Sequence, residues 1–133
     1  MKKYLLLIVI GLSVGLISCE EKCDEIGKYE DCSEWRDAIS GTWNGQATCG
    51  GISTAKTDMI SNGGSLTTIV WSDGFQGELT SGSAFVIPQQ DVISNGQITQ
   101  YSGFGTYSST ELNYTLYATQ NGQQITCTMS AGR

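Results

Sequence analysis

The stretch Gly41-Thr42-Trp43-Asn44-Gly45-Gln46-Ala47-Thr48-Cys49 predicts a β-strand, and with it the class of fold. From Trp43 to Cys49 the odd-numbered positions are apolar or small, whereas the even-numbered positions are polar. Successive side chains of a strand point to opposite faces, so this alternation is typical of a strand with one buried face and one solvated face.

The same alternation recurs along the rest of the chain, between residues that favour tight turns. It is clear in segments 75–79, 111–119 and 124–130, and residues 65–71, 83–87 and 91–107 fill the intervals between them. Asn-Gly and Asp-Gly pairs, which favour the positive φ of tight hairpin turns, separate these segments. They are Asn62-Gly63, Asp73-Gly74, Asn95-Gly96 and Asn121-Gly122. The sequence therefore predicts an all-β, antiparallel up-and-down meander of about eight short strands.

The strand over 52–60 is the weakest prediction, because Lys56 and Asp58 fall in phase with the apolar Ile52 and Ile60. Asp58 is one of five acidic residues between positions 41 and 133, and we interpret all five as solvated surface acids. They are Asp58, Asp73, Glu78, Asp91 and Glu111.

A short helix is predicted just before the first strand. Asp31 is a suitable N-cap, and Glu34 follows it three residues later, as in a capping box. Trp35, Ala38 and Ile39 then form one apolar stripe at helical spacing. The helix leads directly into Gly41-Thr42-Trp43.

A short helix followed by Gly41-Thr42-Trp43 at the start of an eight-stranded meander resembles the calycin group, which comprises lipocalins, fatty-acid-binding proteins and avidins. The resemblance implies a small lipocalin-like barrel over residues 33–133. It also implies that Trp43, with Gly41, plugs the closed end, and that Arg133 is the candidate for the arginine that covers this tryptophan. The chain departs from the lipocalin pattern because it has no Thr-Asp-Tyr motif and no helix after the barrel.

Residues 1–18 are predicted to be a signal peptide, because Lys2 and Lys3 precede an apolar run that is short for a membrane span. The run ends in Leu16-Ile17-Ser18-Cys19, which resembles a bacterial lipobox and implies cleavage before Cys19 and acylation of that residue. Residues 19–32 then form an acidic tether, loosely similar to the export tag of Bacteroidota lipoproteins. We expect an outer-membrane lipoprotein, either surface-exposed or facing the periplasm.

Four further cysteines, an even number in an exported chain, predict two disulfides rather than a metal site. Cys49 lies in the first predicted strand and Cys127 in the last, and these strands are neighbours in a closed antiparallel barrel. The expected pairs are therefore Cys49–Cys127 and Cys23–Cys32, although four cysteines allow three pairings in all.

The composition argues against catalysis and against nucleic acid as a partner. The chain has no histidine, so neither a Ser-His-Asp nor a Cys-His arrangement can form. A net charge of −6 disfavours phosphate binding. We expect no enzyme activity, no metal and no cofactor.

Two binding functions remain open. In the first, a lipocalin-like barrel holds a small apolar or amphipathic ligand. In the second, the core is filled by side chains and the chain contacts a glycan or a protein, an inhibited enzyme included, through an exposed strip of tyrosines on the strand that includes Tyr101, Gly103, Gly105 and Tyr107. The candidate binding residues for the two functions are Phe75, Phe85, Tyr101, Phe104, Tyr107 and Tyr114.

Overall fold

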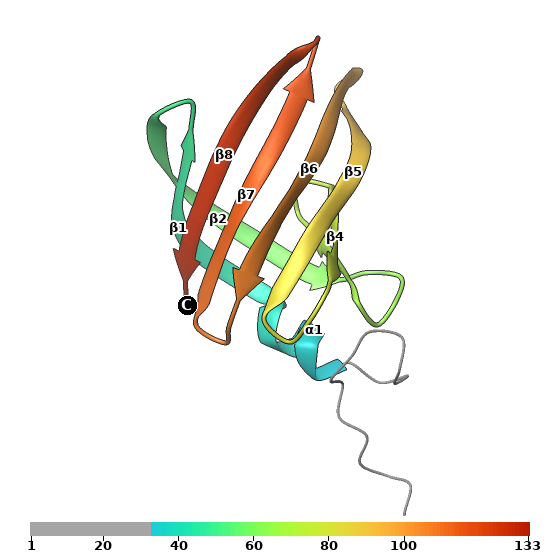
Figure 1. Ribbon diagram of the computed structural model, residues 1–133, viewed down its shortest axis with the longest axis vertical. Helices are drawn as coiled ribbons and strands as arrows, with labels where there is room; N and C mark the ends of the chain where they lie inside the picture. Colours follow the sequence, from blue (N-terminus) through green and yellow to red (C-terminus); the bar gives the residue numbers. More distant parts are fainter. Residues whose placement is uncertain (1–32) are drawn as a thin grey trace, which may run out of the picture.

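The computed structural model describes residues 33–133, which form one short helix and a closed eight-stranded barrel (Figure 1). Helix α1 (Ser33–Ile39) comes first, and each strand pairs with the next in antiparallel order. The strands are β1 (Gly41–Cys49), β2 (Ile52–Asn62), β3 (Thr68–Trp71), β4 (Gln76–Leu79), β5 (Ala84–Ser94), β6 (Gln97–Tyr107), β7 (Glu111–Gln120) and β8 (Gln123–Gly132). The predicted all-β meander is confirmed. Asp31, the predicted helix cap, lies outside the described residues.

Pairing of β1 with β8 closes the barrel, from Asn44 opposite Gly132 to Cys49 opposite Cys127. The last pair is a disulfide with Cα atoms 4.2 Å apart, which confirms the predicted Cys49–Cys127 bridge. The other predicted bridge, Cys23–Cys32, lies outside the described residues, as do Cys19, the lipobox and the tether.

The two ends of the barrel differ in what closes them. Three tight hairpins stand at one end, at the Gly50-Gly51, Asn95-Gly96 and Asn121-Gly122 turns, where all six residues have positive φ. Helix α1 and the carboxyl terminus lie at the opposite end (Figure 1). We call these the hairpin end and the helix end.

At the helix end, Trp43 is fully buried and its Nε1 donates a hydrogen bond of 2.7 Å to the carbonyl of Ile39. The guanidinium carbon of Arg133 lies 4.0 Å from the centre of a Trp43 ring, and its nitrogens donate to the carbonyls of Ala38 and Ser40. Gly41 has a φ of +121°, and a Cβ there would lie 2.9 Å from Nη1 of Arg133. A side chain at position 41 would therefore be strained and would crowd Arg133.

Strand β5 contains an irregularity that the sequence pattern does not predict. Its pairing with β6 shifts register between Ile87 and Gln90, and the side chain of Gln90 then takes over the pairing with β4. The Gln76 N–H donates to Oε1 of Gln90, and Nε2 of Gln90 donates to the Gln76 carbonyl, both at 2.7 Å. This amide side chain thus satisfies backbone groups that a continuous ladder would otherwise pair.

Candidate functional site

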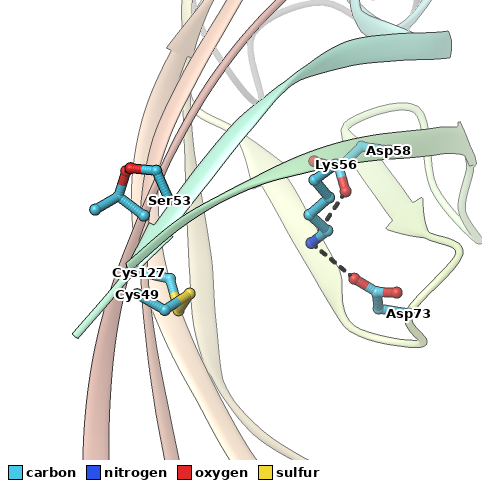
Figure 2. Close-up of a disulfide and its surroundings, with 7 residues drawn as sticks. Cys49, Ser53, Lys56, Asp58, Asp73 and Cys127 are labelled. Atoms are coloured by element: carbon cyan, nitrogen blue, oxygen red, sulfur yellow. Dashed lines mark hydrogen bonds and ion pairs between the residues drawn. A yellow bond between two sulfur atoms is a disulfide. The ribbon is translucent and has the colours of Figure 1, made fainter. Parts of the chain in front are cut away.

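A charged cluster lies inside the barrel, on the inner face of β2 (Figure 2). Lys56 and Asp58 are two residues apart on this strand, so their side chains share one face. The Lys56 ammonium lies 3.1 Å from Oδ1 of Asp58 and 3.0 Å from Oδ2 of Asp73, which comes from the turn between β3 and β4. Lys56 therefore bridges two carboxylates. Only 1% of the Asp58 side chain is exposed, compared with 48% of that of Asp73.

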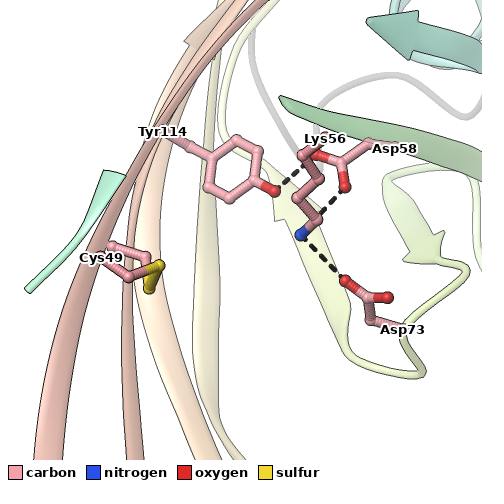
Figure 3. A network of polar contacts seen from close by, with 6 residues as sticks. Cys49, Lys56, Asp58, Asp73 and Tyr114 are labelled. Carbon is pink, nitrogen blue, oxygen red and sulfur yellow. Dashed lines mark hydrogen bonds and ion pairs between the residues drawn. A yellow bond between two sulfur atoms is a disulfide. The ribbon is translucent and has the colours of Figure 1, made fainter. Parts of the chain in front are cut away.

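Tyr114 completes this cluster from β7, whose neighbours in the barrel are β6 and β8 (Figure 3). Its hydroxyl donates a hydrogen bond of 2.6 Å to Oδ2 of Asp58. Both Asp58 oxygens are thus partnered, one by Lys56 and one by Tyr114. Buried carboxylates require such partners, since an unpaired charge in a protein interior is strongly destabilising.

The surroundings shift the protonation of these groups toward the forms that hold the cluster together. Burial lowers the pKa of Lys56, but the hydrogen bond and charge of Asp73 and the charge of Asp58 outweigh it and hold the pKa above its ordinary value. Burial, together with the hydrogen bond to Asp58, raises the pKa of Tyr114. Lys56 is therefore charged and Tyr114 neutral near neutral pH.

An aromatic wall continues from Tyr114. The ring centre of Tyr114 is 5.7 Å from that of Trp71, and Trp71 stacks on Phe75 at 4.8 Å. The ring of Phe75 in turn lies 5.2 Å from that of Tyr101. Trp71 also carries a buried Nε1 donor that meets no acceptor at full hydrogen-bond geometry in the part of the chain that the structure describes, although the Trp71 side chain lies close enough to the Tyr114 hydroxyl to counteract part of the rise in its pKa. An unpartnered buried donor is rare in proteins and marks a place where an acceptor would be stabilising.

The inner side chains change from fully to partly buried along the barrel axis. Those nearer the helix end, such as Leu112, Phe85 and Ile69, are almost completely buried. Those nearer the hairpin end are half-buried and belong to the interior faces of six strands: Cys49, Lys56, Val92, Thr99, Tyr101, Ala118, Gln120 and Cys127. Large exposed isoleucines lie in the strands next to the three hairpins, at positions Ile52, Ile93, Ile98 and Ile125. The hairpin end is therefore the more accessible end of the interior.

The predicted binding residues are distributed over three environments. Phe75, Phe85, Tyr107 and Tyr114 are buried in the core, and Tyr101 is half-buried and packed against it. The prediction of an exposed tyrosine strip is therefore wrong for Tyr107, of which only 4% is exposed. Tyr101 lies on the same inward face of β6, so the strip does not face the solvent outside the barrel. The two glycines of this face leave room for neighbouring residues of the barrel. A Cβ at Gly105, for example, would lie 2.5 Å from side-chain atoms of Phe85 and Tyr114.

Phe104 points the other way, onto the outer wall, and is 54% exposed. Its ring lies 6.5 Å from that of Tyr117. Beside it is a groove of about 460 Å³ across β6, β7, β8 and β1, and none of its lining residues is charged. The outward-facing polar residues of the groove are Gln46, Thr48, Thr106, Asn113, Thr115, Thr128 and Ser130.

The interpretation of all five acids as solvated is wrong for Asp58, which is buried. The signal was present in the sequence, because Lys56 and Asp58 occupy the apolar phase of their strand. In the sequence, these in-phase charges make the strand over 52–60 look weak. In the structure, they form an ion pair on its inner face. Nothing in the sequence identified Asp73 or Tyr114 as the partners, since these contacts are made across the barrel and from a turn.

Within residues 33–133, no group of three or more His, Cys, Asp or Glu side chains is placed to hold a metal ion. In the same residues, no helix is long and apolar enough to cross a membrane. Comparisons with protein-family models, with characterised proteins and with solved structures found no match for this chain.

Proposed function

We propose that this chain is a membrane-anchored, non-catalytic binding protein that holds one small amphipathic molecule in the hairpin end of a lipocalin-like barrel. One observation carries the proposal: partly exposed Lys56 and Asp73 lead from the accessible end of the interior to a buried carboxylate and a buried, unpartnered indole N–H, beside an aromatic wall. Ligand sites in proteins typically combine such apolar walls with a few convergent polar groups.

The two parts of the ligand would meet different parts of this site. An apolar chain would pack against Phe75, Tyr101 and Val92, which lie in or against the core. A polar group would lie near Lys56 and Asp73, whose side chains remain partly exposed. Ile52 and Ile125, which share the inward-facing phase of β2 and β8, would give an apolar entrance.

The anchor in this proposal is Cys19, acylated within its lipobox. Helix α1 begins at Ser33 and lies at the helix end, so a tether that leads into it would enter the barrel at that end (Figure 1). The hairpin end would then face away from the membrane. If the wild-type protein partitions into detergent and the Cys19→Ser variant does not, the anchor is supported. A free Cys19 thiol in the wild-type protein would exclude it.

Ligand binding can be tested with a neutral apolar fluorophore, N-phenyl-1-naphthylamine, and protein carrying Cys19→Ser. We expect saturable binding with one site per chain. Ala118→Trp should abolish it, because Ala118 is half-buried on the inner face of β7 and the larger ring would fill the site. The matched control is Thr119→Trp, on the outer face of the same strand, which should bind as before. Equal loss in both variants, or no saturable binding at all, would refute the proposal.

A second candidate function is favoured by the outer-wall groove. Its uncharged hydroxyl and amide side chains, next to the exposed ring of Phe104 and the half-buried ring of Tyr117, are suited to a neutral glycan or a polar protein surface. A glycan array distinguishes the two functions. The control for Phe104→Ala is Met59→Ala, because Met59 on β2 is similarly exposed. Glycan retention that is lost in Phe104→Ala and kept in Met59→Ala would favour the groove.

A further inference from the structure

We infer that the polar end of the ligand is an uncharged hydrogen-bond acceptor, such as a hydroxyl or carbonyl group, and neither a carboxylate nor an ammonium. This inference rests on the proposed interior site. It follows from two independent properties of the side chains there: the hydrogen-bond donors that remain unused, and the sum of the charges.

The unused donors require an acceptor. An ammonium has three N–H groups, and those of Lys56 are directed at two carboxylates, Asp58 and Asp73, which leaves one. The Nε1 of Trp71 is a second unused donor, and it is buried. A ligand ammonium has no acceptor atom, so it could satisfy neither group.

The charges disfavour an anion. Lys56 contributes one positive charge, and Asp58 and Asp73 contribute two negative charges, so the cluster carries a net charge of −1. Tyr114 is neutral and adds nothing to this sum. The carboxylates already occupy the Lys56 ammonium, so a ligand carboxylate would meet an excess of negative charge in a partly desolvated site.

A hydroxyl group meets both requirements. Its oxygen can accept from Lys56 or Trp71, and its proton can be donated to Oδ1 of Asp73, the oxygen that is not in the ion pair. No charge has to be desolvated for this exchange. A long-chain alcohol or a monoacylglycerol belongs to this class, whereas an ionised fatty acid does not.

The experiment compares three ten-carbon probes that differ only in the polar group: 1-decanol, decanoate and decylamine. Each displaces N-phenyl-1-naphthylamine from the Cys19→Ser protein at about pH 8, where the carboxylate is ionised and the amine protonated. We expect decanol to bind at least about ten-fold more tightly than either charged probe. Equal or tighter binding of decanoate or of decylamine would overturn the inference.

A charge-removing variant makes the test specific to the cluster. Asp73→Asn abolishes the excess negative charge at a partly exposed turn position, and we expect it to reduce the preference for decanol over decanoate about ten-fold. Glu111→Gln is the matched control, because it removes one exposed carboxylate outside the cluster, and it should keep the wild-type preference. If the fluorophore binds but the three probes are not discriminated, the inference fails alone. If no probe and no fluorophore binds, the proposed function fails with it.

Discussion

The hydroxyl of Tyr114 and the carboxylate of Asp58 are 56 positions apart in the sequence and 2.6 Å apart in the barrel. The first residue lies on β7 and the second on β2, and two strands, β8 and β1, separate these in the sheet. The hydrogen bond therefore spans the interior and holds opposite walls together. It also fixes the carboxylate that orients Lys56, so it links the stability of the barrel to the geometry of the site.

Tyr114→Phe is expected to destabilise the fold by about 1.5–3 kcal/mol, the usual contribution of a hydrogen bond to a charged group. The ring would stay in place, but one oxygen of the buried Asp58 would lose its donor. Urea unfolding measures the change. Tyr117→Phe, on the outer face of the same strand, is the control and should change stability little. Equal effects of the two substitutions would show that the Asp58 contact contributes nothing.

Stability should fall as the pH rises above about 10. Burial raises the pKa of Tyr107 from 10.0 to about 12, so the unfolded chain releases this proton near pH 10 and the folded chain only near pH 12. Between these values the folded state binds more protons, and stability must decrease with pH. The raised pKa values of Tyr114 and Lys56 act in the same direction. Denaturant midpoints from pH 9 to 12 test this, and Tyr107→Phe should make the decline shallower. Midpoints that stay level or rise would contradict the assignment.

Removal of the Cys49–Cys127 disulfide by substitution of both residues with Ala should cost about 4.5 kcal/mol, because the bond closes a loop of 127 − 49 + 1 = 79 residues. The control pair is Thr48→Ala with Thr128→Ala, which are cross-strand neighbours on the outer face of the same two strands. That pair should cost no more than about 1 kcal/mol. Similar losses in the two double variants would mean that the closure of the loop is not what stabilises the fold.

Arg133→Ala should destabilise the helix end by about 2 kcal/mol. The substitution removes the cation over Trp43 and the hydrogen bonds to the carbonyls of Ala38, Ser40 and Ser109. Arg133→Lys keeps the charge but lacks the planar donors, so it should recover only part of the loss. Thermal unfolding measures both variants. Full recovery by lysine would show that the charge alone is sufficient.

The strands could be predicted from the sequence because their signals are local. Alternation from Trp43 to Cys49 and the turn at Asn95-Gly96 depend only on neighbouring residues, and both match the structure. The Cys49–Cys127 pair followed from closure, since the first and last strands of a barrel must meet. The shift of register at Gln90 has no such local signal, because it depends on a contact with β4.

The candidate site could be predicted only in part, because its contacts are non-local. Aromatic residues such as Phe75 and Tyr101 are candidates by residue type. The alternation shows that Tyr101 and Tyr107 share one face of their strand, but it does not show that this face packs against the core. Lys56 and Asp58 interrupt the apolar alternation of the strand over 52–60, and this interruption is all that the sequence shows of them. Their role depends on Tyr114 and Asp73, which lie far away in the sequence.

The central claim, a neutral polar group held inside the barrel, is tested most directly by the indole N–H signals of ¹⁵N-labelled protein during titration with 1-decanol. Trp71→Phe assigns the Trp71 signal. We predict that this signal moves downfield as its buried, unpartnered Nε1 gains an acceptor, whereas that of Trp43, already bonded to the Ile39 carbonyl at the helix end, does not move. A Trp71 signal that stays fixed at saturating decanol, or one that moves together with that of Trp43, would contradict the account.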